Sequence, residues 1–329
     1  MAIFVVVLAV NAPAQPPAPI KLVEAFQLPA DVAGHFDHFG VDLKGRRLFA
    51  TPEDYKAVLV LDLSNGKLIG KINGIGRPHA VFYRADLDRI YVTDGNDGDL
   101  KIFDVKTHRL LKSVKLLADA DSMGYDPATK YLYIDNGGGD AHQTYSILSV
   151  VDTTAGTKVA DIKIDGETLE AMALETSSPR LYVNNRRKNR VDVIDRDKRT
   201  LIASWPVTLA KDNVAMALDE ARHRLFVGCR SGQIVIIDTA TGKELQALAI
   251  TKGVDDMAYD PARGRLYAAC DGAIDIEERT GAGDYKFVAT VPSGPLGRTA
   301  RLVPELNRYF VAVPQQGSQN AQVLVYEVH

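Results

Sequence analysis

The stretch RIYVTDGNDG, Arg89 to Gly98, joins a short strand-forming run to a tail of turn-forming residues. Its first half recurs along the chain as RRLFA, DRIYV, KYLYI, PRLYV, HRLFV, GRLYA and NRYFV. The aromatic side chains of these copies are Phe49, Tyr91, Tyr133, Tyr182, Phe226, Tyr267 and Phe310. They follow one another at intervals of about 41 to 49 residues, which is typical of one four-stranded propeller blade. The repeat therefore predicts an all-β fold, a seven-bladed β-propeller.

Each repeat has the pattern of four short strands. A first strand such as VFY or MAY leads through a turn, as in YDPATK or YDPARG, into the aromatic strand. A third strand ends in Asp, as in VLVLD, LKIFD, VDVID and IVIID, and a turn such as SNGK or ATGK precedes the fourth. We expect the blades near residues 34–73, 74–116, 117–164, 165–207, 208–250, 251–292 and 293–329.

The two ends of the repeat complement each other. After Phe310 only one strand-like run, residues 323–328, remains, so the last blade is one strand short. Residues 20–28 (IKLVEAFQL) precede the first repeat and can supply the missing strand. We therefore expect a propeller closed by the N-terminal strand joining the C-terminal blade, an arrangement that removes an exposed sheet edge.

The composition is that of an ordinary globular protein and narrows the choice of partners. The 329 residues are 46% hydrophobic and 25% charged, with a formal net charge of −3. A nucleic-acid-binding protein usually carries a strong basic excess, so we expect no nucleic-acid partner. The two cysteines, Cys229 and Cys270, lie in equivalent positions of LFVGC and LYAAC, which favours two small buried residues over a disulfide.

The N-terminus predicts export. Ala2 to Val10 is apolar but too short to span a bilayer, and Ala12-Pro13-Ala14 offers a small-x-small cleavage pattern before a Pro-rich stretch. No Lys or Arg precedes the apolar run. We expect residues 1–19 to form a signal peptide and leader, and the mature chain to be periplasmic or secreted without membrane insertion.

The strands RIYVTDGNDG (89–98) and RLYVNN (180–185) resemble the signature strands of the YVTN β-propeller repeat family of exported bacterial proteins. The resemblance covers all seven repeats and implies the propeller fold. It implies little about activity, because that family includes binding and surface proteins. The same architecture also carries lactonases, lyases and cofactor-dependent enzymes.

Many carboxylates have a structural explanation. Asp can accept hydrogen bonds from the backbone N–H groups of a turn that it opens. One set of aspartates ends the third strands: Asp62, Asp104, Asp152, Asp195 and Asp238. A second set occupies the turn between the first two strands: Asp42, Asp126, Asp219 and Asp260. We expect all nine to be turn residues.

Two charged loops have alternative explanations. DGNDGD (94–99) resembles a calcium loop but has Gly98 and Val105 where such a loop needs acidic residues, so we expect a hairpin. NRRKNR (185–190) is expected to be a solvated hairpin. The alternative is a basic lip at the axial mouth that Arg230 could join. The third repeat is the longest, and its GGGDAH segment with His142 is expected to be a longer hairpin, with a flap over the mouth as the alternative.

The strongest functional signal is a polar ring around the expected axis. In a propeller the first strand of each blade is innermost, and its beginning opens on one face of the channel. The position twelve residues before each aromatic holds Asp37, His79, Asp121, Glu170, Val214, Asp255 and Arg298. Two residues further on, the ring is apolar: Phe39, Val81, Met123, Met172, Met216, Met257 and Ala300. This contrast predicts a ligand site, against the simpler explanation that strand starts at a mouth are merely solvated.

The polar ring has too many carboxylates to be stable without compensation. Two like charges about 8 Å apart at an effective dielectric constant of about 20 repel by about 2 kcal/mol. A bound cation, partial protonation, or pairing with His79 and Arg298 would each offset this. The expected metal ligands are Asp37, His79, Asp121, Glu170 and Asp255, which suit calcium, magnesium or manganese better than zinc. The expected ligand-binding residues are Asp37, His38, His79, Asp121, Glu170, Asn213, Asp255 and Arg298.

Two functions remain open. The chain has no Gly-x-Ser-x-Gly, phosphate-binding glycine-rich loop, His-Glu-x-x-His or haem-attachment motif. The favoured hypothesis is an exported binding or interaction propeller whose axial mouth holds a small polar molecule or cation. The alternative is a metal-dependent hydrolase or lyase of the lactonase type, with candidate catalytic residues His79, Asp121, Glu170 and Arg298.

Overall fold

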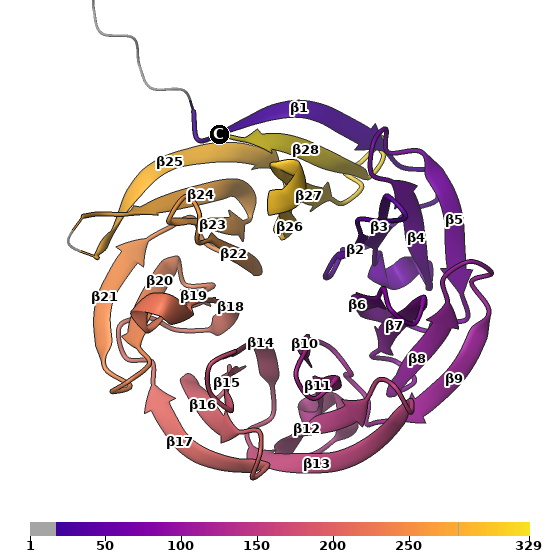
Figure 1. Cartoon of the computed structure of the whole chain (residues 1–329). Coiled ribbons are helices and arrows are strands. Elements are labelled where there is room, and N and C mark those ends of the chain that lie inside the picture. Colours follow the sequence, from indigo (N-terminus) through magenta and orange to yellow (C-terminus); the bar gives the residue numbers. More distant parts are fainter. Residues whose placement is uncertain (1–17, 282) are drawn as a thin grey trace, which may run out of the picture.

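The computed structural model describes residues 18–281 and 283–329, and within them the strands form seven four-stranded antiparallel sheets around a central axis (Figure 1). The predicted seven-bladed β-propeller is therefore confirmed. Most of the expected signal peptide, up to residue 17, lies outside the described residues. No helix among the described residues has the length and hydropathy needed to cross a membrane.

The first three blades follow the sequence order of their strands. Blade one contains β2 (Gly40–Asp42), β3 (Arg47–Ala50), β4 (Ala57–Asp62) and β5 (Leu68–Asn73). Blade two contains β6 (Pro78–Arg84), β7 (Arg89–Asp94), β8 (Asp99–Asp104) and β9 (Leu110–Lys115). Blade three contains β10 (Met123–Asp126), β11 (Tyr131–Gly137), β12 (Tyr145–Asp152) and β13 (Thr157–Asp165).

The next three blades repeat the same order. Blade four contains β14 (Leu169–Leu174), β15 (Arg180–Asn185), β16 (Arg190–Asp195) and β17 (Thr200–Pro206). Blade five contains β18 (Asn213–Asp219), β19 (Arg224–Cys229), β20 (Gln233–Asp238) and β21 (Glu244–Ala249). Blade six contains β22 (Asp256–Asp260), β23 (Arg265–Cys270), β24 (Gly272–Arg279) and β25 (Tyr285–Gly294).

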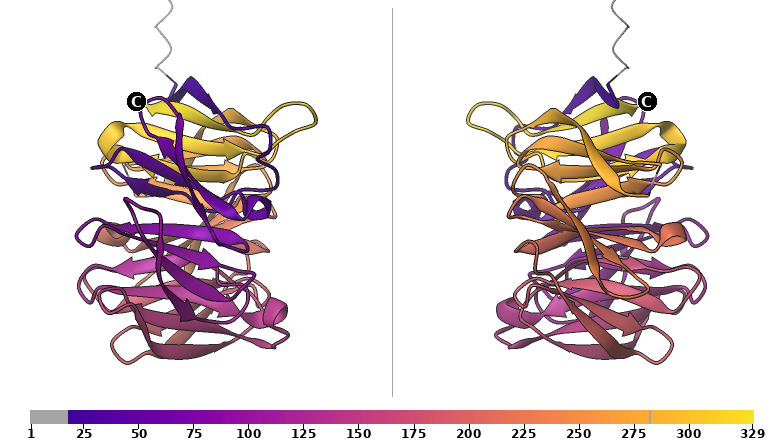
Figure 2. Two further views of the ribbon diagram at one scale, coloured as in Figure 1. Left: turned by 90° about the vertical axis from the view of Figure 1, so that its right-hand side faces the viewer. Right: turned by 90° about the vertical axis from the view of Figure 1, so that its left-hand side faces the viewer.

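Blade seven combines both ends of the chain, as predicted. Its order is β26 (Thr299–Val303), β27 (Arg308–Val313), β28 (Gln322–Val328) and, outermost, β1 (Ile20–Gln27). β1 pairs antiparallel with β28 along its whole length, from Ile20 opposite Val328 to Gln27 opposite Gln322. The two strands lie together on the rim of the disc (Figures 1 and 2). The N-terminal strand therefore closes the ring.

The repeated aromatic residues form the core between blades. All seven lie on the second strand of a blade and are at most 1% exposed: Phe49, Tyr91, Tyr133, Tyr182, Phe226, Tyr267 and Phe310. Both faces of the inner strands pack against neighbouring blades, so each such ring stabilises the fold by roughly 1.5–3 kcal/mol. Cys229 and Cys270 are buried on β19 and β23 with free thiols, as expected for small core residues.

The expected turn aspartates behave as turn residues. Oδ1 of Asp104, for example, accepts hydrogen bonds from the backbone N–H groups of Lys106 at 3.0 Å and Thr107 at 2.8 Å. Asp219 differs, because its carboxylate accepts hydrogen bonds from the hydroxyls of Tyr259 and Tyr285. The DGNDGD segment is the expected hairpin, in which Asp94 pairs with Asp99. NRRKNR is likewise the hairpin between β15 and β16.

Four short 3₁₀ segments occur in the described loops, η1 (Glu53–Tyr55), η2 (Gly138–Ala141), η3 (Glu220–Arg222) and η4 (Pro304–Leu306). η2 forms the insertion of blade three. Its Gly139 N–H donates to the carbonyl of Glu167 at 2.9 Å, and the neighbouring Asp140 lines the axial mouth. The insertion thus borders the mouth.

Candidate functional site

The beginnings of the seven innermost strands surround one cavity of about 370 Å³, the mouth cavity. Every residue of the predicted polar ring lines it: Asp37, His79, Asp121, Glu170, Val214, Asp255 and Arg298. His38 also lines it, together with loop residues that include Glu53, Arg77, Asp119, Asp140, Arg186 and Arg230. The repeat register therefore identified residues that do meet in space, although they come from seven different blades.

One side of the mouth cavity is built from imidazoles and carboxylates. Nδ1 of His79 contacts Oδ2 of Asp37 and lies 3.4 Å from Oδ1 of Asp121. Nε2 of His79 is directed against Gly95, where any side chain would collide with the imidazole. Burial alone would lower the pKa of His79, but the charge of Asp121 and the hydrogen bond to Asp37 raise it to about 10. His79 is therefore a fixed cation at neutral pH.

His38 forms the floor of the mouth cavity. Its Nδ1 lies 2.9 Å from Oδ1 of Asp256 in blade six, and its Nε2 lies 3.2 Å from Oγ of Ser122 in blade three. Burial opposes protonation, but the charges of Asp37 and Asp256 raise the pKa of His38 well above its usual value. As an imidazolium it donates from both ring nitrogens, which matches these acceptors.

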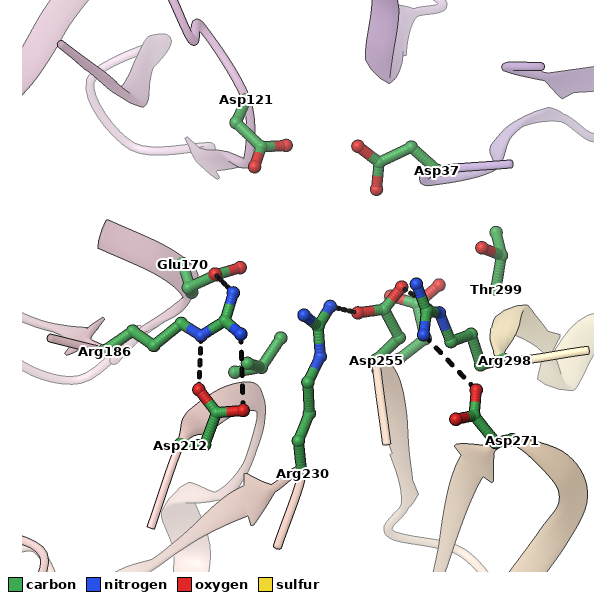
Figure 3. A network of polar contacts seen from close by, with 12 residues as sticks. Asp37, Asp121, Glu170, Arg186, Asp212, Arg230, Asp255, Asp271, Arg298 and Thr299 are labelled. Carbon is green, nitrogen blue, oxygen red and sulfur yellow. Dashed lines mark hydrogen bonds and ion pairs between the residues drawn. The ribbon is translucent and has the colours of Figure 1, made fainter. Parts of the chain in front are cut away.

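Asp37 and Asp121 titrate in opposite directions, although they face the same space (Figure 3). Burial would raise the pKa of Asp37, but the charge of His38 and the hydrogen bond from His79 hold it below its usual value. Burial and the charge of Asp37 raise the pKa of Asp121 well above its usual value. Two adjacent carboxylates that cannot both ionise easily are typical of sites that bind a cation or exchange a proton.

The other side of the mouth cavity is built from arginine–carboxylate pairs (Figure 3). Arg186, from the hairpin between β15 and β16, contacts Glu170 at 3.0 Å and also contacts Asp212. The basic-lip alternative for this hairpin therefore describes Arg186 correctly. Burial raises the pKa of Glu170 to about 7 even though the charge of Arg186 lowers it.

Asp255 is held by two guanidinium groups. Arg230 contacts its Oδ1, and Nε of Arg298 lies 3.3 Å from its Oδ2. Nη1 of Arg298 also lies 3.3 Å from Oδ1 of Asp271. The cavity thus has an imidazole–carboxylate side and a guanidinium side.

The structure brings only part of the predicted metal set together. The atoms of Asp37, His38 and Asp121 that could ligate a metal all lie within 4.8 Å of one another. His38 was predicted as a ligand-binding residue but not as a metal ligand. Glu170 and Asp255 line the same cavity but contact arginines instead.

Asn213 does not reach the mouth cavity. It is fully buried and donates hydrogen bonds to Oδ1 of Asn184 at 2.8 Å and to the carbonyl of Arg190 at 3.0 Å. The count from the aromatic residue reaches Val214 in this blade, and Val214 does line the cavity, whereas the side chain of the neighbouring Asn213 contacts blade four. Its expected place among the ligand-binding residues is therefore wrong.

Several lining residues lay outside the predicted ring, among them Asp119, Asp140, Glu53 and Arg77. They come from loops whose positions the repeat does not define. Arg77 pairs with Glu53 of the preceding blade through Nη2 and Oε2, 2.6 Å apart. The only available signal was their place just before or after a strand on the face of the polar ring.

Comparisons with known proteins support the fold and leave the activity open. Over 115 residues the chain is 29% identical to "Uncharacterized protein YncE" of Salmonella typhi and 28% identical to the protein of that name from Salmonella typhimurium. Each match covers 35% of this chain and only 32% of the relative, so it spans about a third of the length of either protein. No protein-family model matches the chain, so membership in the YVTN repeat family stays a prediction.

Solved structures share the architecture over nearly the whole chain. A chain of the Kuenenia stuttgartiensis hydrazine synthase matches with a TM-score of 0.73 and 19% identity, covering 90% of this chain and 96% of that chain. A chain of the mitotic checkpoint complex matches with a TM-score of 0.77 and 14% identity, covering 100% of both chains. At such identities the likeness shows the fold alone. The chain is thus a seven-bladed propeller with weak homology to YncE.

Proposed function

We propose that this propeller binds a divalent cation and, with it, a small polar ligand at the axial mouth. The observation that supports this most is the convergence of Asp37, His38 and Asp121 within 4.8 Å. Oδ1 of Asp121 is buried there and has no hydrogen-bond partner in the described part of the chain. A cation would provide the missing interaction and offset the repulsion between the two carboxylates.

The donor set favours a hard cation. Two carboxylates and one imidazole suit manganese, magnesium or calcium, and zinc is a poorer fit without thiolates or further imidazoles. Binding would displace the proton from the Nε2 of His38 that faces Asp37, so that affinity should rise with pH. On the far side of the cavity, the guanidinium groups of Arg186, Arg230 and Arg298 would donate to oxygen atoms of the bound molecule.

Calorimetric titration of the metal-free protein with Mn²⁺, Mg²⁺, Ca²⁺ and Zn²⁺ tests the cation site. We expect Asp121→Asn to weaken binding by at least about tenfold, because it removes one charge of the three-residue group. The matched control is Asp140→Asn, since Asp140 lines the same cavity but is exposed and stands outside that group. Absence of binding to the wild type, or equal binding by Asp121→Asn, would show the mouth to be solvated only.

A metal-dependent hydrolase or lyase of the lactonase type is the second candidate. The pKa of Glu170, about 7, favours it, because a general base works best when its pKa is close to the working pH. Turnover of a panel of lactones and esters, abolished in both Glu170→Gln and His79→Ala, would support the enzyme. Retained turnover in both variants would assign the reaction to a contaminant.

Export is part of the same proposal. It rests on residues 1–19, of which those up to 17 lie outside the described residues. Sequencing the N-terminus of the protein recovered from the periplasmic or extracellular fraction tests it. A cleaved form that begins after Ala14 is the expected result.

A further inference from the structure

The outermost strand of every blade contains a β-bulge close to its beginning. In all seven blades one residue of this strand is left without a partner on the neighbouring strand. The unpaired residue is aliphatic each time: Val23, Ile69, Leu111, Val159, Ile202, Leu245 and Val288. A bulge redirects the side chain that it carries, but it does not require that side chain to be apolar. The repetition of aliphatic residues therefore needs an explanation of its own.

These bulges place large apolar side chains in solvent around the whole circumference. Six of the seven bulge residues are between 37% and 53% exposed. In blade six Val288 packs against the core instead, and the adjacent Phe287 is 54% exposed. The strands that carry them form the rim of the disc (Figure 1). We call the exposed set the rim girdle: Val23, Ile69, Leu111, Val159, Ile202, Leu245 and Phe287.

The rim girdle lies on the face of the disc opposite the mouth cavity. Glu53, between β3 and β4, and Arg77, between β5 and β6, line the mouth cavity, so the other ends of these strands meet on the far face. The outermost strands begin at that far face. Their mouth-side halves expose no large hydrophobic residue in the described part of the chain. The same strands are thus apolar toward one face only, where Leu43 and Leu306 are exposed as well.

A basic side chain accompanies each member of the rim girdle. It precedes the apolar residue by one to three positions and is exposed in all seven blades: Lys21, Lys67, Arg109, Lys158, Arg199, Lys243 and Lys286. Equivalent positions of the blades lie on one ring around the axis, so the cations and the apolar side chains encircle the same face. The whole chain has a formal net charge of −3, so this positive rim is a local feature.

We propose that the rim girdle holds the protein on an anionic lipid surface, with its mouth cavity facing away from the lipid. Basic residues beside exposed apolar ones are typical of proteins that lie at the boundary between lipid head groups and acyl chains. The cations would contact the lipid phosphates, and the apolar side chains would enter the layer beneath them. The protein rests on the surface and does not span the bilayer.

The shape and charge of the rim girdle favour lipid over a second copy of the chain. A two-fold contact through this face would bring two basic rings together, and like charges repel. A ring as wide as the disc also needs a partner that is flat over the same width, as a bilayer is. The proposal goes beyond the proposed function and does not depend on it, because Asp37 and Asp121 line the cavity of the opposite face.

Co-sedimentation of the protein with lipid vesicles tests the apolar part of the rim girdle. We expect vesicles of phosphatidylcholine with about 30% phosphatidylglycerol to bind the wild type at least about tenfold more tightly than phosphatidylcholine alone. The triple variant Leu111→Ser, Ile202→Ser and Phe287→Ser should lose at least about tenfold in affinity. Leu209→Ser, at a 51% exposed residue between β17 and β18 on the mouth face, is the control and should bind as the wild type does.

A pair of charge-matched variants tests the basic part. Changing three lysines of the rim to glutamate should abolish binding to the anionic vesicles: Lys67→Glu, Lys243→Glu and Lys286→Glu. The control makes the same change of net charge at three exposed lysines of mouth-side loops and should keep most of the binding: Lys188→Glu, Lys211→Glu and Lys252→Glu. Thermal unfolding shows that each variant is folded. Asp121→Asn should lose the cation and keep vesicle binding, which separates the two proposals.

Four results would overturn the inference. The first is a wild type that does not sediment with anionic vesicles at about 1 mM lipid. The second is equal binding by the serine triple variant. The third is an equal loss in the two lysine triple variants, which would show attraction by net charge alone. The last is self-association of the wild type in analytical ultracentrifugation that the serine variant abolishes, which would assign the rim girdle to a second copy of the chain.

Discussion

His38 of blade one contacts Asp256 of blade six, with Nδ1 and Oδ1 2.9 Å apart although 218 residues separate the two in sequence. On its other side the same ring lies 3.2 Å from Oγ of Ser122 in blade three. These three blades are not neighbours in the ring (Figure 1). One side chain therefore connects the walls of the channel across its open space, at the edge of the mouth cavity.

Replacing His38 by alanine should destabilise the protein. The change removes two hydrogen bonds, one of them charge-assisted, and leaves Asp256 with only its backbone donor. We expect the free energy of unfolding to fall by roughly 2–3 kcal/mol in urea denaturation at pH 6. His142→Ala, at an exposed histidine in the blade-three insertion, should have little effect. A His38→Ala variant as stable as the wild type would show that the contacts across the channel contribute nothing.

His79 should make stability depend on pH. Its pKa is raised from 6.5 to about 10, so the native state binds this proton more tightly than the unfolded chain does. The contribution is complete below pH 6.5 and is lost as pH rises toward 10, by at most about 1.4 kcal/mol per pH unit. The difference in unfolding free energy between wild type and His79→Gln, measured across this range, should shrink with pH. Parallel curves would contradict the prediction.

Glu277 should also make stability fall as pH rises, although the protonated form of this side chain is neutral and that of His79 is charged. It is fully buried on β24, neither carboxyl oxygen has a described partner, and burial together with Asp275 raises its pKa from 4.5 to about 8. The native state keeps the proton, so the stabilisation present below pH 4.5 is lost as pH rises through 8.

Glu277→Gln tests this, because the amide resembles the protonated carboxyl group and does not titrate. We expect the variant to match the wild type near pH 5 and to exceed it by roughly 1–3 kcal/mol at pH 8 to 9. Glu305→Gln, at an exposed site, controls for the loss of one charge. An equal effect of the two substitutions would refute the role of burial.

The closing strand should contribute strongly to stability through Phe26. This side chain is 3% exposed on β1, and its ring centroid lies 6.4 Å from that of Phe310. We expect Phe26→Ala to cost about 3–5 kcal/mol in denaturant unfolding, since the site cannot easily collapse. Leu22→Ala, at a residue of the same strand that is 49% exposed, should cost less than about 0.5 kcal/mol. Similar losses for both would mean that the strand contributes only its backbone pairing.

The repeat made the fold and the mouth ring predictable from sequence. Aromatic residues such as Tyr91 define the register of each blade, and a fixed count from them reaches the start of the innermost strand. That count reaches cavity-lining residues in all seven blades, Val214 included, but it does not say that the neighbouring Asn213 is buried away from the cavity. It also said nothing of Arg186 with Glu170, or of His38 with Asp256, because these contacts depend on loop paths and on side chains that reach across the ring.

The pairing of β1 with β28 has a consequence for the order of folding. Blades one to six are each built from consecutive strands, so each can form soon after its own residues leave the ribosome. β1 is made before all of them, yet its partner strand is the last to appear. During synthesis the earliest strand must wait with its hydrogen-bonding groups unmatched, and this slow, long-range step is when the chain is most open to aggregation or chaperone capture.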